Sequence, residues 1–211
     1  MCLGPVFQHG RARRIDAEIG ASEFREPGDP DTIAEMPEVD LVVGTAEKTQ
    51  LLDLINDTCS LGRTFVTRSR STEFQDMDIM NFGGRSRAFV KVQEGCNEFC
   101  SFCVIPFARG RSRSRTVEST VSQVGRLVQS GYQEVVLTGV HIGDYGMDLD
   151  VRFVDLLEAV ERVQGLKRFR VSSIEATFLT PEVIDFLAST PKFCRHLHVP
   201  LQSGADVATF P

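Results

Sequence analysis

Residues 95–103 read Gly-Cys-Asn-Glu-Phe-Cys-Ser-Phe-Cys, and they hold half of the six cysteines of the chain. Cys96, Cys100 and Cys103 follow a C-x3-C-x2-C pattern directly after an alternating apolar run at residues 88–92. Three thiols this close in sequence can point into one small volume, whereas disulfides would pair two of them and leave the third over. The stretch therefore predicts a metal centre on a loop that follows a strand.

The kind of metal centre depends on the missing fourth ligand. Three cysteine thiolates can hold three irons of a cubane cluster and leave the fourth iron open to a substrate or cofactor. A structural zinc site uses four closed ligands, and His141, His196 or His198 could complete one only through the fold. The spacing favours an open iron–sulfur site over zinc. The spacing favours either metal site over buried free thiols at these three positions. Cys59 and Cys194, in contrast, are interpreted as buried free thiols.

Composition and charge narrow the class of protein. The 211 residues are 42% hydrophobic and 25% charged. The net charge of −6 means that any contact with nucleic acid must come from a local patch. No apolar run approaches the ~20 residues that a membrane span needs, and residues 1–14 lack the apolar core of a signal peptide. Clustered thiols without a secretion signal predict a cytoplasmic protein that makes no contact with a membrane.

The first part of the chain predicts about half of a small α/β domain. A short helix is expected over 30–36 with a proline at an early position. A buried strand at 39–43 and a helix capped by Thr45 should follow. Residues 68–87 are polar, contain glycine and show no sustained period, which predicts a linker after a domain at 1–67.

From residue 88 onward the sequence repeats a strand–loop–helix pattern. We expect strands at 88–92, 134–138, 168–172 and 196–200, and helices at 117–130, 153–163 and from Thr180 onward. Strands separated by helices of this length pair in parallel through right-handed crossovers, which defines the α/β class. Four β/α units cannot close an eight-stranded barrel. The region 88–211 is therefore expected to form an open arc, or a fragment, of a (β/α) barrel.

The residues around the cysteines carry a specific resemblance. Phe102 precedes the last cysteine of the pattern, Val-Lys-Val-Gln-Glu-Gly-Cys-Asn stands at 90–97, and Cys-Val-Ile-Pro-Phe-Ala-Arg-Gly stands at 103–110. This combination resembles the methylthiotransferase branch of the radical S-adenosylmethionine (radical SAM) enzymes. Segments 110–115, 137–146, 172–175 and 196–204 are most similar to one bacterial type within the branch.

The resemblance implies an activity and its cofactors. That type adds a methylthio group to C2 of N6-threonylcarbamoyladenosine at position 37 of tRNA. A 4Fe-4S cluster would be held by Cys96, Cys100 and Cys103, with the amine and carboxylate of SAM on its open iron. Reductive cleavage of SAM would give a 5′-deoxyadenosyl radical, while the protein binds, orients and excludes water. The anticodon loop of tRNA is the implied partner, flavodoxin or ferredoxin the implied electron donor, and a monomer is expected.

The implied contacts with SAM lie on loops at the carboxyl ends of the strands. They are Phe102, Gly139, Ser173, Glu175, Gln202 and Ser203. Phe102 would position adenine, and Gly139 would let the backbone approach the ligand closely. Glu175 and Gln202 offer polar groups to the amine or the ribose.

A run of arginines next to the cysteines is the candidate contact with tRNA phosphates. It consists of Arg109, Arg111, Arg113 and Arg115. A charge run of this kind is also typical of a solvated surface. Its position beside the cysteine pattern favours a functional role.

The chain departs from the family in its first part. Family members hold a second cubane cluster with three separated cysteines in an amino-terminal domain, whereas residues 21–28 contain no cysteine and residues 1–28 match poorly. We expect a remnant of that domain, one cluster instead of two, and an incomplete enzyme truncated at both ends. The alternatives are a methylthiotransferase acting on a ribosomal-protein aspartate, and a non-catalytic RNA-binding fragment with zinc or a cluster.

Overall fold

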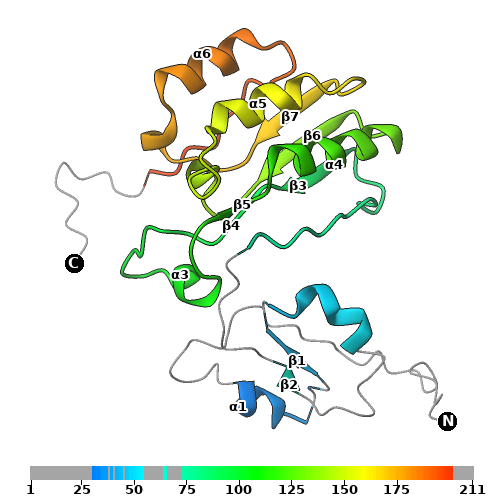
Figure 1. Cartoon of the computed structure of the whole chain (residues 1–211), viewed down its shortest axis with the longest axis vertical. Coiled ribbons are helices and arrows are strands. Elements are labelled where there is room, and N and C mark those ends of the chain that lie inside the picture. Colours follow the sequence, from blue (N-terminus) through cyan, green and yellow to red (C-terminus); the bar gives the residue numbers. More distant parts are fainter. Residues whose placement is uncertain are drawn as a thin grey trace. The chain divides into compact units, whose positions relative to one another are not determined.

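The structure is a computed structural model that describes residues 30–37, 39, 41–44, 46–54, 64–65 and 73–201 (Figure 1). The chain divides into two compact units. Among the described residues, the first unit holds those up to 65 together with 107–110, and the second holds 73–106 and 111–201. Within the described residues, no helix combines the length and apolar character needed to cross a bilayer.

The first unit contains short elements. They are α1 (Pro30–Ala34), β1 (Val42–Val43), the 3-10 helix η2 (Lys48–Gln50), which leads into helical residues 51–54, and β2 (Thr64–Phe65). β1 and β2 pair in parallel, and Ile33, Val39 and Val42 form a small buried cluster. The helix and strand expected at 30–36 and 39–43 are present but shorter. Thr45, the expected cap, lies outside the described residues.

Three parallel strands form the sheet of the second unit. They are β3 (Arg87–Lys91), β6 (Glu134–Thr138) and β7 (Arg168–Val171), with β6 in the middle (Figure 1). Four of the five β6 residues are buried, which is typical of a parallel strand covered on both faces. The strands expected at 88–92, 134–138 and 168–172 are confirmed, with ends displaced by a residue at most.

Glu134 opens β6 at the amino-terminal edge of the sheet among three arginines. Arg170 Nε donates a hydrogen bond of 2.6 Å to Oε1, Arg168 Nη2 lies 3.0 Å from Oε2, and Arg87 Nε lies 3.8 Å from Oε1. Burial opposes ionisation of this carboxyl. The hydrogen bond from Arg170 and the three positive charges outweigh burial, and together they lower the pKa of Glu134.

Three amphipathic helices cover the sheet through one apolar core. They are α4 (Val117–Gln129), α5 (Phe153–Glu161) and α6 (Pro181–Ser189). The core joins the helix residues Leu127, Leu157 and Leu187 to the strand residues Val90, Leu137 and Phe169. Caps confirm two of the expected helix starts: the Thr116 side chain accepts from the Ser119 N–H, and the Thr180 side chain accepts from the Val183 N–H.

The strand expected at 196–200 is wrong. These residues form no strand, and the chain instead pairs with β7 further upstream. Phe169 N donates to Lys192 O at 2.9 Å and Cys194 N donates to Phe169 O at 3.0 Å, which makes an isolated parallel bridge at Phe193. Further along, Ile174 N, on the loop after β7, donates to His198 O at 3.1 Å. The alternating apolar residues at 196–200 therefore belong to a segment that is not hydrogen-bonded into the sheet.

Small elements that the sequence did not predict surround the cysteines. β4 (Gln93–Glu94) pairs antiparallel with β5 (Arg113–Ser114), and α3 (Ile105–Ala108) lies between them in the chain. The elements are too short to produce a hydrophobic period. Because β4 and β5 pair, the two ends of the cysteine-bearing segment are held together.

The described part of the expected linker, 73–86, contains no helix or strand and is part of the second unit. Phe82 N donates to the Tyr132 hydroxyl at 3.1 Å, and the two rings meet edge to face at 5.8 Å. Asp76 and Asp78 form ion pairs with Arg115 at 2.9 and 2.7 Å. This segment thus belongs structurally to the unit that it precedes.

Candidate metal centre

Three loops meet at the carboxyl-terminal edge of the parallel sheet. We name residues 95–104 the cysteine loop and residues 139–150 the β6 loop; the third loop, 172–175, follows β7. In parallel α/β sheets, the residues of a functional site gather at this edge because successive strands deliver their loops to it. The three loops therefore bring together residues that are far apart in the sequence.

The backbone of the cysteine loop is tightly curved. Gly95 has φ 78° and Phe99 has φ 47°, both in the left-handed region. The Phe99 conformation is uncommon for a residue with a side chain and costs on the order of 1 kcal/mol or more. Cys103 N donates to Cys100 O at 2.9 Å, which closes a turn between the second and third cysteines.

The three cysteines of the loop have different environments. Cys96 is buried, Cys100 is exposed and Cys103 is half-buried, and all three are free thiols. Burial raises the pKa of Cys96, and the charges of Asp144 and Glu98 raise it further against a hydrogen bond from the Glu98 N–H. The Cys96 sulfur therefore stays a thiol until a metal ion or a cluster replaces its proton.

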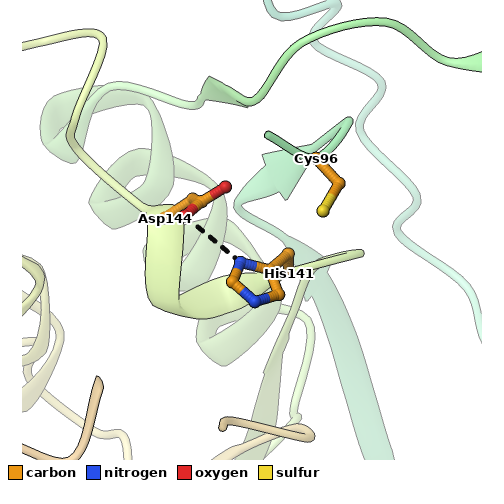
Figure 2. Close-up of side chains that lie close together, drawn as sticks. All are labelled: Cys96, His141 and Asp144. Carbon is orange, nitrogen blue, oxygen red and sulfur yellow. Dashed lines mark ion pairs between the residues drawn. The ribbon is translucent and has the colours of Figure 1, made fainter. Parts of the chain in front are cut away.

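Cys96 faces a histidine and a carboxylate on the β6 loop (Figure 2). One ligand atom each from Cys96, His141 and Asp144 lies within 4.8 Å of the other two, and all three residues are buried. His141 immediately precedes the 3-10 helix η3 (Ile142–Asp144), whose last residue is Asp144. His141 is 45 residues from Cys96 in the sequence, and the fold brings the two side chains together.

The His141 ring lies between two carboxylates. Its Nδ1 is 3.2 Å from Asp144 Oδ1, and its Nε2 is 3.4 Å from Glu175 Oε2 on the loop after β7. Both contacts lie within hydrogen-bonding distance but outside its usual angles, so the two carboxylates hold the ring mainly through charge. Asp144 raises the pKa of His141 against the effect of burial, and Glu175 adds to the increase.

Gln93 joins the cysteine loop to the β6 loop. Its fully buried amide donates to Gly95 O and to Ser112 Oγ, each at 2.8 Å, and accepts from His141 N at 2.8 Å. A Cβ on Gly139 would lie 2.8 Å from Gln93 Oε1 and 3.0 Å from its Cβ. Gly139 was expected to let the backbone approach a ligand. The structure shows a different need for glycine at this position, which is room for the Gln93 side chain.

Further hydrogen bonds fix the β6 loop against β5 and the cysteine loop. Asn97 N donates to Asp144 Oδ2 at 3.4 Å, and Ser114 N donates to Asp148 Oδ2 at 2.8 Å. The Tyr145 hydroxyl donates to Arg115 O at 2.7 Å. The loop therefore presents His141 and Asp144 from a backbone that is anchored along its length.

The other expected SAM contacts lie around this centre. The Phe102 side chain is 70% exposed at the surface of the cysteine loop. Ser173 is exposed and its hydroxyl lies 2.7 Å from His198 Nδ1. Glu175 approaches His141, as described above, and is one-third exposed. Gln202 and Ser203 lie outside the described residues.

The arginine run separates into two environments. Arg111 is exposed, and its guanidinium lies over the Phe99 ring at 4.5 Å from the ring centroid; Arg109 is half-buried. Arg113 and Arg115 are buried, with Arg113 Nη2 4.0 Å from Glu94 and Arg115 bound to Asp76 and Asp78. The expectation that all four arginines face RNA phosphates is therefore corrected for these two. They lie on or beside β5, where the protein's own acids neutralise them.

The residues present suit an iron–sulfur cluster by their chemistry. The cysteine loop offers three soft thiols from a short segment without regular structure around Cys96 and Cys100, so the sulfurs can approach a common group. Elsewhere, Cys194 is half-buried, and Cys59 lies outside the described residues.

Fold and site together define a radical SAM protein. A family model described as the radical SAM superfamily matches residues 90–209, and the chain belongs to this superfamily. The superfamily implies a 4Fe-4S cluster and SAM as cofactors.

Two groups of curated tRNA-modifying proteins are similar to the chain. It is 44% identical over 184 residues to threonylcarbamoyladenosine tRNA methylthiotransferase MtaB of Bacillus subtilis (strain 168), covering 84% of this chain and 40% of that protein. The same-named protein of Aquifex aeolicus (strain VF5) is 37% identical, over 95% of this chain and 50% of that protein. A tRNA-2-methylthio-N(6)-dimethylallyladenosine synthase of Clostridium botulinum (strain Loch Maree / Type A3) is 34% identical, over 87% and 42%. The chain thus spans half or less of the length of these relatives.

Proposed function

We propose that the chain is a radical SAM methylthiotransferase that acts on C2 of N6-threonylcarbamoyladenosine at position 37 of tRNA. The observation that carries the proposal is the meeting of three loops at Cys96, where His141 and Asp144 of the β6 loop and Glu175 after β7 converge on the cysteine loop. The similarity to the MtaB proteins supports the choice of this tRNA base.

In this proposal Cys96, Cys100 and Cys103 hold one cluster. The bound cluster and SAM would supply the one-electron chemistry of the superfamily. The chain's own residues hold and shield that chemistry: the buried Gln93 fixes the start of the cysteine loop, and the anchored β6 loop covers Cys96. Cysteines elsewhere in the chain are Cys2, Cys59 and Cys194 alone, which supports one cluster per chain.

SAM would lie between the cysteine loop and the loop after β7. Phe102 would contact adenine, and Ser173 and Glu175 would offer a hydroxyl and a carboxylate to the amine or ribose. Gln202 and Ser203 complete the proposed set by resemblance.

The RNA contact is proposed at the exposed rim of the cysteine loop. Phe99 and Arg111 stack on each other there, and an aromatic ring with a guanidinium suits both a nucleobase and a phosphate. Arg109 is kept in this set. A flavodoxin or ferredoxin would donate the electron, the chain would act as a monomer, and free thiols suit the cytoplasm.

Anaerobic reconstitution with iron and sulfide tests the cofactor assignment. We expect about four irons per chain, the content of one cubane cluster, and formation of 5′-deoxyadenosine from SAM under reduction. Cys100→Ala should abolish the cluster absorption, whereas Cys194→Ala, a half-buried thiol outside the loop, should leave it intact. A normal cluster in Cys100→Ala, or about eight irons per chain, would contradict the assignment.

The substrate is tested by giving the reconstituted chain two acceptors. One is tRNA that carries N6-threonylcarbamoyladenosine, and the other is the ribosomal protein whose aspartate is modified by related enzymes. We expect the methylthio group on the tRNA nucleoside by mass spectrometry. Modification of the ribosomal protein alone would show that the chain is of the aspartate-modifying type. SAM cleavage without either product would support the cofactor assignment and contradict both substrates.

A further inference from the structure

We propose that the cluster-free chain binds a single Zn²⁺ ion through Cys96 Sγ, one ring nitrogen of His141 and a carboxylate oxygen of Asp144. This site shares one cysteine with the proposed cluster and takes its other ligands from the β6 loop. The inference does not depend on the methylthiotransferase activity. It concerns a second metal-binding state of the same edge of the sheet.

The donor atoms have the chemistry and nearly the spacing of a zinc site. Thiolate, imidazole and carboxylate are the groups that Zn²⁺ accepts, with bonds of about 2.3, 2.0 and 2.1 Å. Two nitrogen or oxygen ligands of one tetrahedral zinc are consequently about 3.3 Å apart. Nδ1 of His141 and Oδ1 of Asp144 are 3.2 Å apart. The sulfur of Cys96, within 4.8 Å of both partners, needs to move inward by only about 1 Å.

The His141 ring supplies an independent reason to expect a metal ion. The residue is buried, and each ring nitrogen lies close to a carboxylate oxygen, at 3.2 Å from Asp144 and 3.4 Å from Glu175, without the angles of a well-aligned hydrogen bond. Buried polar atoms are well paired in the large majority of cases, and a metal ion between the ring and Asp144 would improve the poorly aligned contact there. A zinc ion on Nδ1 would bind the nitrogen that faces Asp144 (Figure 2).

Glu175 takes the position of an outer carboxylate. Its Oε2 lies 3.4 Å from Nε2, the ring nitrogen on the opposite side of His141 from Asp144. Zinc-bound histidines usually donate their second N–H to such a group, which fixes the ring and strengthens the ligand. A water molecule would complete the coordination, since three protein ligands leave one position open.

Zinc and the iron–sulfur cluster would exclude each other, because both use Cys96. Zinc binding replaces the thiol proton of Cys96 and any proton on the coordinating nitrogen of His141. These protons pass to the buffer, and the sulfur–zinc and nitrogen–zinc bonds form without any redox change. Once this bond exists, the cysteine loop offers only Cys100 and Cys103 to iron. The zinc-loaded chain should therefore resist cluster assembly.

The test uses the full chain, stripped of metal under reducing conditions and titrated with zinc sulfate. We expect one equivalent to bind, and X-ray absorption at the zinc edge to show one sulfur among nitrogen and oxygen neighbours. Three sulfur neighbours, or no bound zinc, would overturn the proposal. The spectroscopic result does not depend on any variant being folded.

Substitutions distinguish this site from a zinc site built on the three cysteines. His141→Ala and Asp144→Asn should lose the bound zinc, whereas Cys103→Ala and the exposed control His198→Ala should retain it. Glu175→Gln should weaken binding about 10- to 100-fold. Loss of zinc in Cys103→Ala together with retention in His141→Ala would refute the ligand set.

The competition is measured by adding iron and sulfide to zinc-loaded protein. Zinc should suppress cluster formation in the wild-type chain and should not suppress it in His141→Ala. Equal suppression in both proteins would contradict a zinc site that needs His141. Because cluster formation without zinc is recorded in parallel, a failure of the zinc site leaves the cluster assignment to be judged separately.

Discussion

Replacing Arg115 with methionine should destabilise the second unit by about 2–4 kcal/mol. Methionine keeps most of the apolar volume, so the loss comes from the guanidinium, which is 2% exposed. Its partners Asp76 and Asp78 are 55% and 35% exposed, so they stay hydrated and each ion pair contributes about 1 kcal/mol or less. Gln123 is buried and would lose the partner of its Oε1, which costs about 1–3 kcal/mol.

Urea unfolding followed by far-ultraviolet circular dichroism measures this loss as a lower midpoint at an unchanged slope. Arg111→Met is the matched control, since Arg111 is exposed and its contact with Phe99 is worth less than about 1 kcal/mol. In tRNA binding the order should reverse: Arg111→Met lowers the salt dependence by about one released ion, and Arg115→Met leaves it unchanged. A wild-type midpoint for Arg115→Met, with weakened tRNA binding, would refute the structural role and restore this arginine to the RNA contact.

Three further substitutions test the sheet and the site. Because folding lowers the pKa of Glu134, its ion pairs stabilise the fold fully above the pKa of the unfolded chain, about 4.3, and this stabilisation is lost as the pH falls through the pKa of the folded protein. The difference in unfolding free energy between the wild type and Glu134→Gln should therefore disappear in acid. A difference that does not change with pH would contradict this. Gln93→Leu should lower the free energy of unfolding by about 2–4 kcal/mol, because it leaves buried polar groups on two loops without a hydrogen-bonding partner. It should also speed amide hydrogen exchange in the β6 loop. The exposed control Gln129→Leu should do neither. Gly139→Ala should cost about 1–3 kcal/mol through its overlap with Gln93, while Gly125→Ala in α4, which meets no atom within 4 Å, should be neutral or stabilising in thermal unfolding.

The sequence predicted the sheet well where apolar periodicity and helix caps agreed. Residues 135–137 are continuously apolar between Glu134 and Thr138, and Thr116 and Thr180 stand where caps should. Residues 196–200 alternate as a strand would but form none, because alternation does not specify a hydrogen-bonding partner. Pairing is a property of two segments, and here β7 takes its partner around Phe193.

The candidate site was predictable only in part, for a related reason. The cysteine pattern is local, so Cys96, Cys100 and Cys103 could be recognised from spacing. Asp144 lies in the segment 137–146 that carries the resemblance, but it was not singled out as a possible ligand, because its contact with Cys96 and His141 depends on the fold. Gln93 was missed as well, because a single buried amide between two short strands leaves no period.

Arg115 is also where the segment before β3 meets the site. Its guanidinium holds Asp76 and Asp78, while its carbonyl oxygen accepts the hydroxyl proton of Tyr145. Tyr145 directly follows Asp144, one of the three groups around Cys96. One residue therefore couples the position of the incoming chain to the position of a carboxylate at the metal centre, so that a change far from the cysteines, at Asp76 or Asp78, should alter metal affinity without touching any ligand.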